Sequence, residues 1–128
     1  MSKHIIILFV AISTTMMLMS GCSAKTRGKD IDKIAYVAGT LQTTEAQNFP
    51  IVYPAAIKAL GDLGLNITKE TTDAVSTRII ARDELDRKIN VNLDGTANGT
   101  TEIKIRYGAL GHEARSQALY DQIIKNIQ

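Results

Sequence analysis

The chain has 128 residues, of which 45% are hydrophobic and 22% are charged, and its formal net charge at pH 7 is +2. This length is enough for one small domain with its own core. The nearly balanced charge gives no general attraction to nucleic acid, and no nucleic-acid partner is expected. The single cysteine excludes an intramolecular disulfide, so packing alone must hold the domain together.

The N-terminal residues have the pattern of a secretory signal. A short basic start precedes an apolar run over residues 5–19, which Ser13 and the two threonines after it interrupt. A helix needs about 20 apolar residues to cross a bilayer. The run therefore predicts the apolar core of a signal peptide rather than a membrane span, and residues 1–21 are expected to be removed.

The run Leu18-Met19-Ser20-Gly21-Cys22 resembles a bacterial lipobox, in which an aliphatic residue and a short variable pair precede a lipidated cysteine. The resemblance implies that the Cys22 thiol carries a diacylglycerol and that the new amine carries a further chain such as palmitate. Two chains anchor a protein stably, whereas one binds only marginally. The alternative is an ordinary cysteine near a cleavage site. This covalent lipid is the only attached group expected, with no other cofactor.

The residues after Cys22 indicate where in the cell envelope the protein is expected to lie. Ser23 stands where aspartate favours inner-membrane retention in Gram-negative lipoproteins. In a Gram-negative host, the resemblance therefore implies the outer membrane and a domain facing the periplasm. Residues 22–33 are charged and poor in apolar side chains, which predicts a solvated tether, although contact with anionic headgroups is an alternative. Residues 34–128 are expected to form a single domain.

Periodicity predicts the first elements of this domain. Residues 34–41 favour a strand, either paired at a sheet edge or extended as an arm, and residues 42–48 are polar and turn-like. Regular helix is expected from about Pro54, with Gly64 as its C-terminal cap. Its apolar face is expected to comprise Val52, Ala55, Ala56, Ala59, Leu60 and Leu63, which follow helical spacing.

Four strands are predicted next, over residues 65–70, 76–82, 88–94 and 101–107. Apolar and polar side chains alternate along them, which indicates an antiparallel sheet with one dry and one solvated face. The turn-forming residues 94–99 predict a hairpin between the last two strands.

The chain is expected to end in a helix, with Ile123, Ile127 and either Ala118 or Leu119 on one stripe. Two amphipathic helices must cover the dry face of the sheet. The predicted fold is α+β: a two-layer sandwich with an antiparallel sheet of four to five strands, two helices on one face and the order β-α-β-β-β-β-α.

Residues 36–127 resemble DUF3568, a family of small bacterial lipoproteins of unknown function. The matching features are Tyr53 with Ala56, the alternating strands, and Gly108 and Gly111 before a final helix that contains Ser116. The resemblance implies this fold and a lipoprotein address. It implies no activity or ligand.

Few residues offer catalytic chemistry. His112 could act as a base with Ser116 and Glu113, but the same residues suit a solvated first turn of the final helix. Residues 83–86, Asp-Glu-Leu-Asp, are interpreted as a salt-bridged, solvated turn rather than an acid–base pair or calcium loop. No catalytic residue and no metal site is predicted.

The solvated sheet face is the candidate interaction surface. Its cations are Arg78, Arg82, Lys88, Lys104 and Arg106. They could meet an acidic polymer, lipopolysaccharide phosphate or an envelope protein, or simply be solvated charges that blunt edge aggregation. The favoured hypothesis is a non-catalytic, lipid-anchored envelope protein acting as an interaction or structural module. The alternative is a small-ligand-binding or enzymatic module with a pocket near Gly108–Ser116. The oligomeric state is not predicted.

Overall fold

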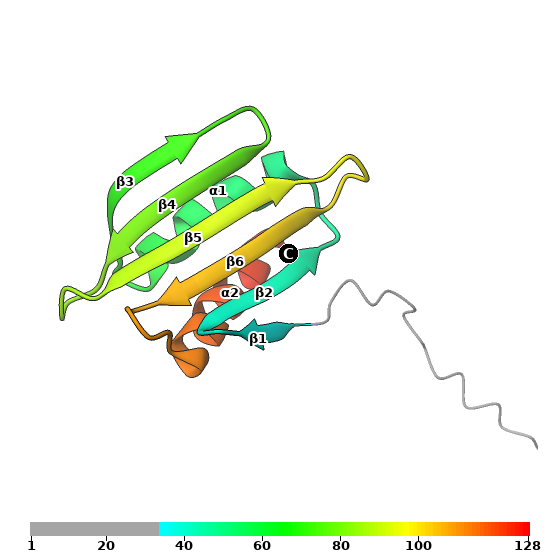
Figure 1. Ribbon diagram of the computed structural model, residues 1–128. Helices are drawn as coiled ribbons and strands as arrows, with labels where there is room; N and C mark the ends of the chain where they lie inside the picture. The colour runs from blue at the N-terminus through cyan, green and yellow to red at the C-terminus, as the bar shows by residue number, and fades with distance from the viewer. Residues whose placement is uncertain (1–33) are drawn as a thin grey trace, which may run out of the picture.

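The computed structural model describes residues 34–128, which form a six-stranded antiparallel sheet with two helices behind it (Figure 1). The strands lie in the order β1-β2-β6-β5-β4-β3. The predicted two-layer α+β fold is confirmed, with six strands in place of four to five. In chain order the elements are β1 (Ala35–Val37), β2 (Thr40–Glu45), α1 (Phe49–Asp62), β3 (Asn66–Thr72), β4 (Ser76–Arg82), β5 (Lys88–Gly95), β6 (Thr101–Tyr107) and α2 (Glu113–Ile127).

The additional strand arises because the segment expected as one strand over residues 34–41 folds back on itself. Ala38 and Gly39 have φ values of 49° and 82°, and they form the two-residue turn between β1 and β2. Such turns need left-handed backbone at both positions. The polar stretch expected as a turn is instead strand as far as Glu45, because β2 pairs with β6 and buries Leu41 and Thr43.

Helix α1 begins at Phe49, five residues before the expected start at Pro54. Pro50 lies in the first turn, where the missing N–H would have no partner inside the helix. Pro54 does remove one hydrogen bond from the helix interior. Burial of Phe49 and Val52 in the core offsets that loss, because tertiary packing supplies most helix stability.

The end of α1 confirms the predicted glycine cap. Gly64 has a φ of 70°, and its N–H donates to the Gly61 carbonyl while the Leu65 N–H donates to the Leu60 carbonyl. These two bonds satisfy carbonyls that the helix itself leaves open. Leu63, expected on the buried face, is the C-cap residue and is 42% exposed.

The dry face of the sheet is the one predicted. Helix α2 lies over β2 and β6, and α1 lies over β3, β4 and β5, so the two helices cover this face together (Figure 1). Within residues 34–128, neither helix covers the other face of the sheet. The buried apolar residues of the sheet are Leu41, Ile79, Ala81, Ile89, Val91, Leu93, Ile103, Ile105 and Tyr107.

Candidate functional site

Cations and amides alternate across the uncovered sheet face. Lys104 on β6 lies opposite Asn92 on β5, which in turn lies opposite Arg78 on β4. Gln42 on β2 continues this row beyond Lys104. Because neighbouring strands lie about 4.8 Å apart, the backbones of Lys104 and Arg78 are separated by about 10 Å, with an amide between them.

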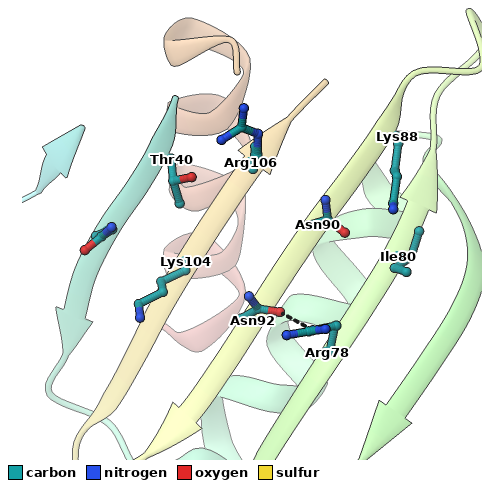
Figure 2. Close-up of a pocket in the computed structure, with 9 residues that line it drawn as sticks. Thr40, Arg78, Ile80, Lys88, Asn90, Asn92, Lys104 and Arg106 are labelled. Atoms are coloured by element: carbon teal, nitrogen blue, oxygen red, sulfur yellow. Dashed lines mark hydrogen bonds between the residues drawn. The ribbon is translucent and has the colours of Figure 1, made fainter. Parts of the chain in front are cut away.

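A second row runs parallel to the first, with Arg106, Asn90 and Ile80 as cross-strand neighbours. Together the two rows form an open hollow of about 420 Å³, which we call the basic hollow (Figure 2). None of the residues of the described chain that line it is acidic. The lining residues are Thr40, Gln42, Arg78, Ile80, Lys88, Asn90, Asn92, Lys104 and Arg106.

Three of these cations have no neutralising partner among the described residues. Arg78 Nε donates a hydrogen bond of 3.3 Å to Asn92 Oδ1, which is an uncharged acceptor. Within residues 34–128, neither Lys88 nor Lys104 forms a side-chain hydrogen bond or an ion pair. Unpaired cations on a surface raise the local positive potential and attract anions.

Arg106 has a different role from the other cations. Its guanidinium donates one hydrogen bond of 2.9 Å to the Ala38 carbonyl and another to the Ala109 carbonyl. These bonds connect the β1–β2 turn to the loop between β6 and α2. Arg106 therefore fixes the rim of the basic hollow as well as adding charge to it.

Arg82, the fifth predicted cation, lies outside the basic hollow. Its Nη1 donates to the Asp86 carbonyl at 2.9 Å, and its Nε lies 3.7 Å from the Asp86 carboxylate. With Lys88 and Arg106 it lines an adjoining hollow of about 490 Å³. The structure thus brings four of the five predicted cations into one hollow and places Arg82 beside it.

The acidic residues of the same face gather towards the opposite end. Asp94 on β5 lies opposite Glu102 on β6, one row beyond Lys104. Asp94 and Asp73 line a further hollow of about 460 Å³, which shares Arg78 and Lys104 with the basic hollow. The face is therefore graded from positive to negative along β5.

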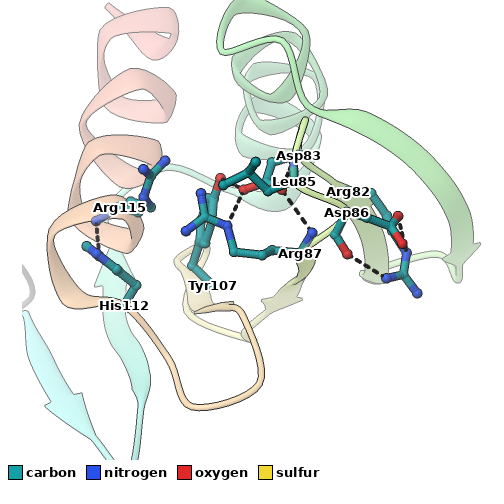
Figure 3. A network of polar contacts seen from close by, with 8 residues as sticks. All are labelled: Arg82, Asp83, Leu85, Asp86, Arg87, Tyr107, His112 and Arg115. Atoms are coloured by element: carbon teal, nitrogen blue, oxygen red, sulfur yellow. Dashed lines mark hydrogen bonds and ion pairs between the residues drawn. The ribbon is translucent and has the colours of Figure 1, made fainter.

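The turn over residues 83–86 is salt-bridged, as predicted, but Asp83 is not solvated. Its side chain is 7% exposed and accepts hydrogen bonds from the Arg87 guanidinium at 2.7 Å and from the Tyr107 hydroxyl at 2.8 Å (Figure 3). The backbone N–H groups of Leu85 and Arg87 also donate to it, each at 2.9 Å. The carboxylate thus joins the β4–β5 turn to the end of β6.

This network displaces two pKa values in opposite directions. Burial alone would raise the pKa of Asp83, but the hydrogen bonds from Arg87 and Tyr107 and the charge of Arg87 outweigh it and lower the pKa from 3.8 to about 2. The pKa of Tyr107 is raised by burial and by its hydrogen bond to the negative Asp83, against a smaller opposing effect of Arg115. Both groups are held in their ordinary charge states at neutral pH.

The ring of Tyr107 is also flanked by two guanidinium groups. Arg87 Cζ lies 5.5 Å from the ring centroid and Arg115 Cζ lies 5.6 Å from it. These cation–π contacts link the β4–β5 turn and the first turn of α2 through one aromatic ring. The cluster has the features of a structural clamp, because its carboxylate is committed to four donors.

His112 and Ser116 do not form a nucleophile–base pair. His112 is the N-cap of α2, and its Nδ1 accepts a hydrogen bond of 3.2 Å from the Arg115 N–H (Figure 3). Ser116 is fully buried in the core layer, and its hydroxyl has no hydrogen-bond partner in the described chain. His112 lines neither the hollow that contains Gly108 nor the one that contains Arg115.

Cys22 and the expected signal peptide and tether lie outside the described residues. In the part of the chain that the structure describes, neither helix has both the length and the apolar composition needed to cross a bilayer. Among residues 34–128, no three His, Cys, Asp or Glu side chains are grouped so that they could hold a metal ion.

Two parts of this site were missed at the sequence level. Thr40 and Gln42 line the basic hollow because β2 runs from Thr40 to Glu45. The alternation of Leu41 and Thr43 with them was the available signal. The clamp around Asp83 joins residues 24 positions apart in sequence. No local pattern indicates that contact.

The fold and the graded sheet face define a class: small two-layer α+β domains with one polar sheet face left uncovered. The chain belongs to the family DUF3568, described as a protein of unknown function, whose model matches residues 3–126. No curated protein matches the chain.

Proposed function

We propose that this protein is a non-catalytic, lipid-anchored interaction module of the bacterial cell envelope, with its domain facing the periplasm. The observation that carries the proposal is the basic hollow, in which Arg78, Lys88 and Lys104 have no acidic partner in the part of the chain that the structure describes. Unpaired cations concentrated on one open face suit recognition of an anionic envelope component, either a protein or a glycolipid.

The lipid anchor is proposed from the resemblance of residues 18–22 to a lipobox. Tethering near a membrane raises the effective concentration of the face for a partner held in the same envelope. The enzymatic alternative near Gly108–Ser116 has weaker support, because His112 Nδ1 is occupied as a helix cap and the Ser116 hydroxyl is buried.

Photo-crosslinking in living cells tests the proposal. A photoreactive residue replaces Lys104, and the matched control replaces Lys58, an exposed cation of α1 on the other layer. We expect a discrete protein adduct or a glycolipid adduct from position 104 and none from position 58. Equal adduct patterns from both positions, or none from position 104, would contradict the proposal.

A further inference from the structure

The central strands narrow the class of ligand that can occupy the basic hollow. It lies over β4, β5 and β6, each of which is already paired on both edges. A peptide therefore cannot add to the sheet there by main-chain hydrogen bonding, which is a common mode of peptide recognition. The lining also contains one apolar side chain, Ile80, and no aromatic residue. Aromatic side chains, which often anchor the centre of a protein interface, are therefore absent from this lining.

The spacing of the cations suits a ligand with two anionic groups. Lys104 and Arg78 come from strands that are not neighbours, and Asn92 lies between them. With about 10 Å between their backbones and Asn92 between them, the two cations can each hold a separate anionic group. Arginine binds phosphate in a bidentate manner, and lysine binds it as a point charge, so each cation can serve one phosphate.

The amides between the cations suit a sugar. An amide side chain both donates and accepts hydrogen bonds, as sugar hydroxyls do. Asn92 Oδ1 accepts from Arg78 Nε, which fixes the amide and leaves its N–H groups available within the described residues. Asn90 and Gln42 offer the same groups in the adjoining positions of the hollow.

We infer that the basic hollow binds a glycan with two phosphate groups about one disaccharide apart. This inference rests on the proposed function. Arg78 holds one phosphate and Lys104 holds the other. Asn92, with Asn90 and Gln42, contacts the sugar between them. Lys88 adds to the attraction from the rim of the hollow.

Equilibrium binding to the full chain, purified in detergent, tests this inference. The probes are a glucosamine disaccharide phosphorylated at both ends, the same disaccharide with one phosphate, the unphosphorylated disaccharide, and inorganic phosphate. We expect the doubly phosphorylated probe to bind most tightly, with about tenfold weaker binding of the singly phosphorylated one. Arg78→Gln and Lys104→Gln should each weaken binding of the first probe about tenfold.

Lys58→Gln is the matched control, since it removes the same charge from the helical layer. It should leave binding of the doubly phosphorylated probe unchanged. A further measurement presents the doubly phosphorylated disaccharide as a lipid headgroup in vesicles. Tighter binding to the vesicles would indicate a membrane glycolipid as the ligand. Unchanged binding would indicate a soluble glycan.

Equal affinity for inorganic phosphate and the doubly phosphorylated disaccharide would overturn the inference, and so would the absence of saturable binding. If the glycan fails to bind while position 104 crosslinks to a protein, the inference falls and the proposed function stands. If the glycan fails to bind and position 104 gives no adduct, both the inference and the proposed function are contradicted.

Discussion

Gly39 and Gly111 lie backbone against backbone, where the β1–β2 turn meets the loop before α2. Their φ values are 82° and 81°, so both positions favour glycine. A Cβ atom at Gly39 would lie 2.6 Å from the Leu110 carbonyl oxygen, and one at Gly111 would strike the backbone of Gly39. The Arg106 guanidinium donates hydrogen bonds to the Ala38 and Ala109 carbonyls at the same junction. The sheet edge and the start of α2 are thus fixed together beside the basic hollow.

Replacing Gly111 with alanine should therefore destabilise the protein strongly. The obstructing atoms belong to backbone and cannot rotate away, so Gly111→Ala should lower the free energy of unfolding by about 3 kcal/mol. Gly99→Ala is the control, because Gly99 has a similar φ of 75° but open space around its added Cβ. Gly99→Ala should lower the free energy of unfolding by about 1 kcal/mol. Urea denaturation measures both, and equal losses would contradict a close contact at Gly111.

The cations of the sheet face should separate into structural and binding groups. Arg106→Gln removes two charged hydrogen bonds to carbonyls and should lower the free energy of unfolding by about 1–2 kcal/mol. Lys104→Gln removes an unpaired surface charge and should change it by less than about 0.5 kcal/mol. Thermal and urea unfolding of the two variants provide the comparison. A larger loss for Lys104→Gln than for Arg106→Gln would refute the assignment of Arg106 as the structural cation.

Asp83 should make stability depend on acid pH. Its pKa is lowered in the folded state, so its contribution is complete above the ordinary value of 3.8 and is lost as pH falls through about 2. Asp83→Asn should lower the urea midpoint at pH 7, and its difference from the unmodified chain should shrink between about pH 4 and 2. The control is Asp86→Asn, whose side chain is 85% exposed and whose loss should matter little. A pH-independent difference for Asp83→Asn would contradict the clamp.

The proposed lipid anchor would depend on one atom, the Cys22 sulfur. Cells fed an alkynyl fatty acid should incorporate the label into the unmodified chain, and Cys22→Ser should abolish that incorporation because serine offers no thiol. Ser23→Ala is the neighbouring control and should retain the label. Undiminished labelling of the Cys22→Ser chain would remove the lipobox interpretation.

Strict alternation made the central strands predictable. Ile89, Val91 and Leu93 are fully buried, as their period of two requires, and Lys88 lies on the opposite face. Gly64 was predictable as a cap because it follows the last helical apolar residue and adopts a left-handed backbone. In both cases the sequence pattern lies within a single element, and burial of its apolar side chains stabilises the predicted structure.

Contacts between residues far apart in the sequence account for the elements that differ from the sequence prediction. The early start of α1 depends on burial of Phe49 in the core, which offsets the hydrogen bond lost at Pro54. Residues 42–45 become strand because β6 pairs with them from almost 60 positions away. The basic hollow contains the predicted cations Arg78, Lys88, Lys104 and Arg106, but only the strand register places an amide between Lys104 and Arg78.

The central claim is that the charge of the uncovered sheet face recruits its partner. The most direct test places a photoreactive residue at Asn90, inside the basic hollow, and compares adduct yield in living cells between two backgrounds. One carries Arg78→Gln with Lys104→Gln, and the other carries Lys58→Gln with Lys125→Gln, which removes equal charge from the exposed helical layer. We predict that the adduct is lost in the first background and retained in the second. Equal yields in both would contradict the claim.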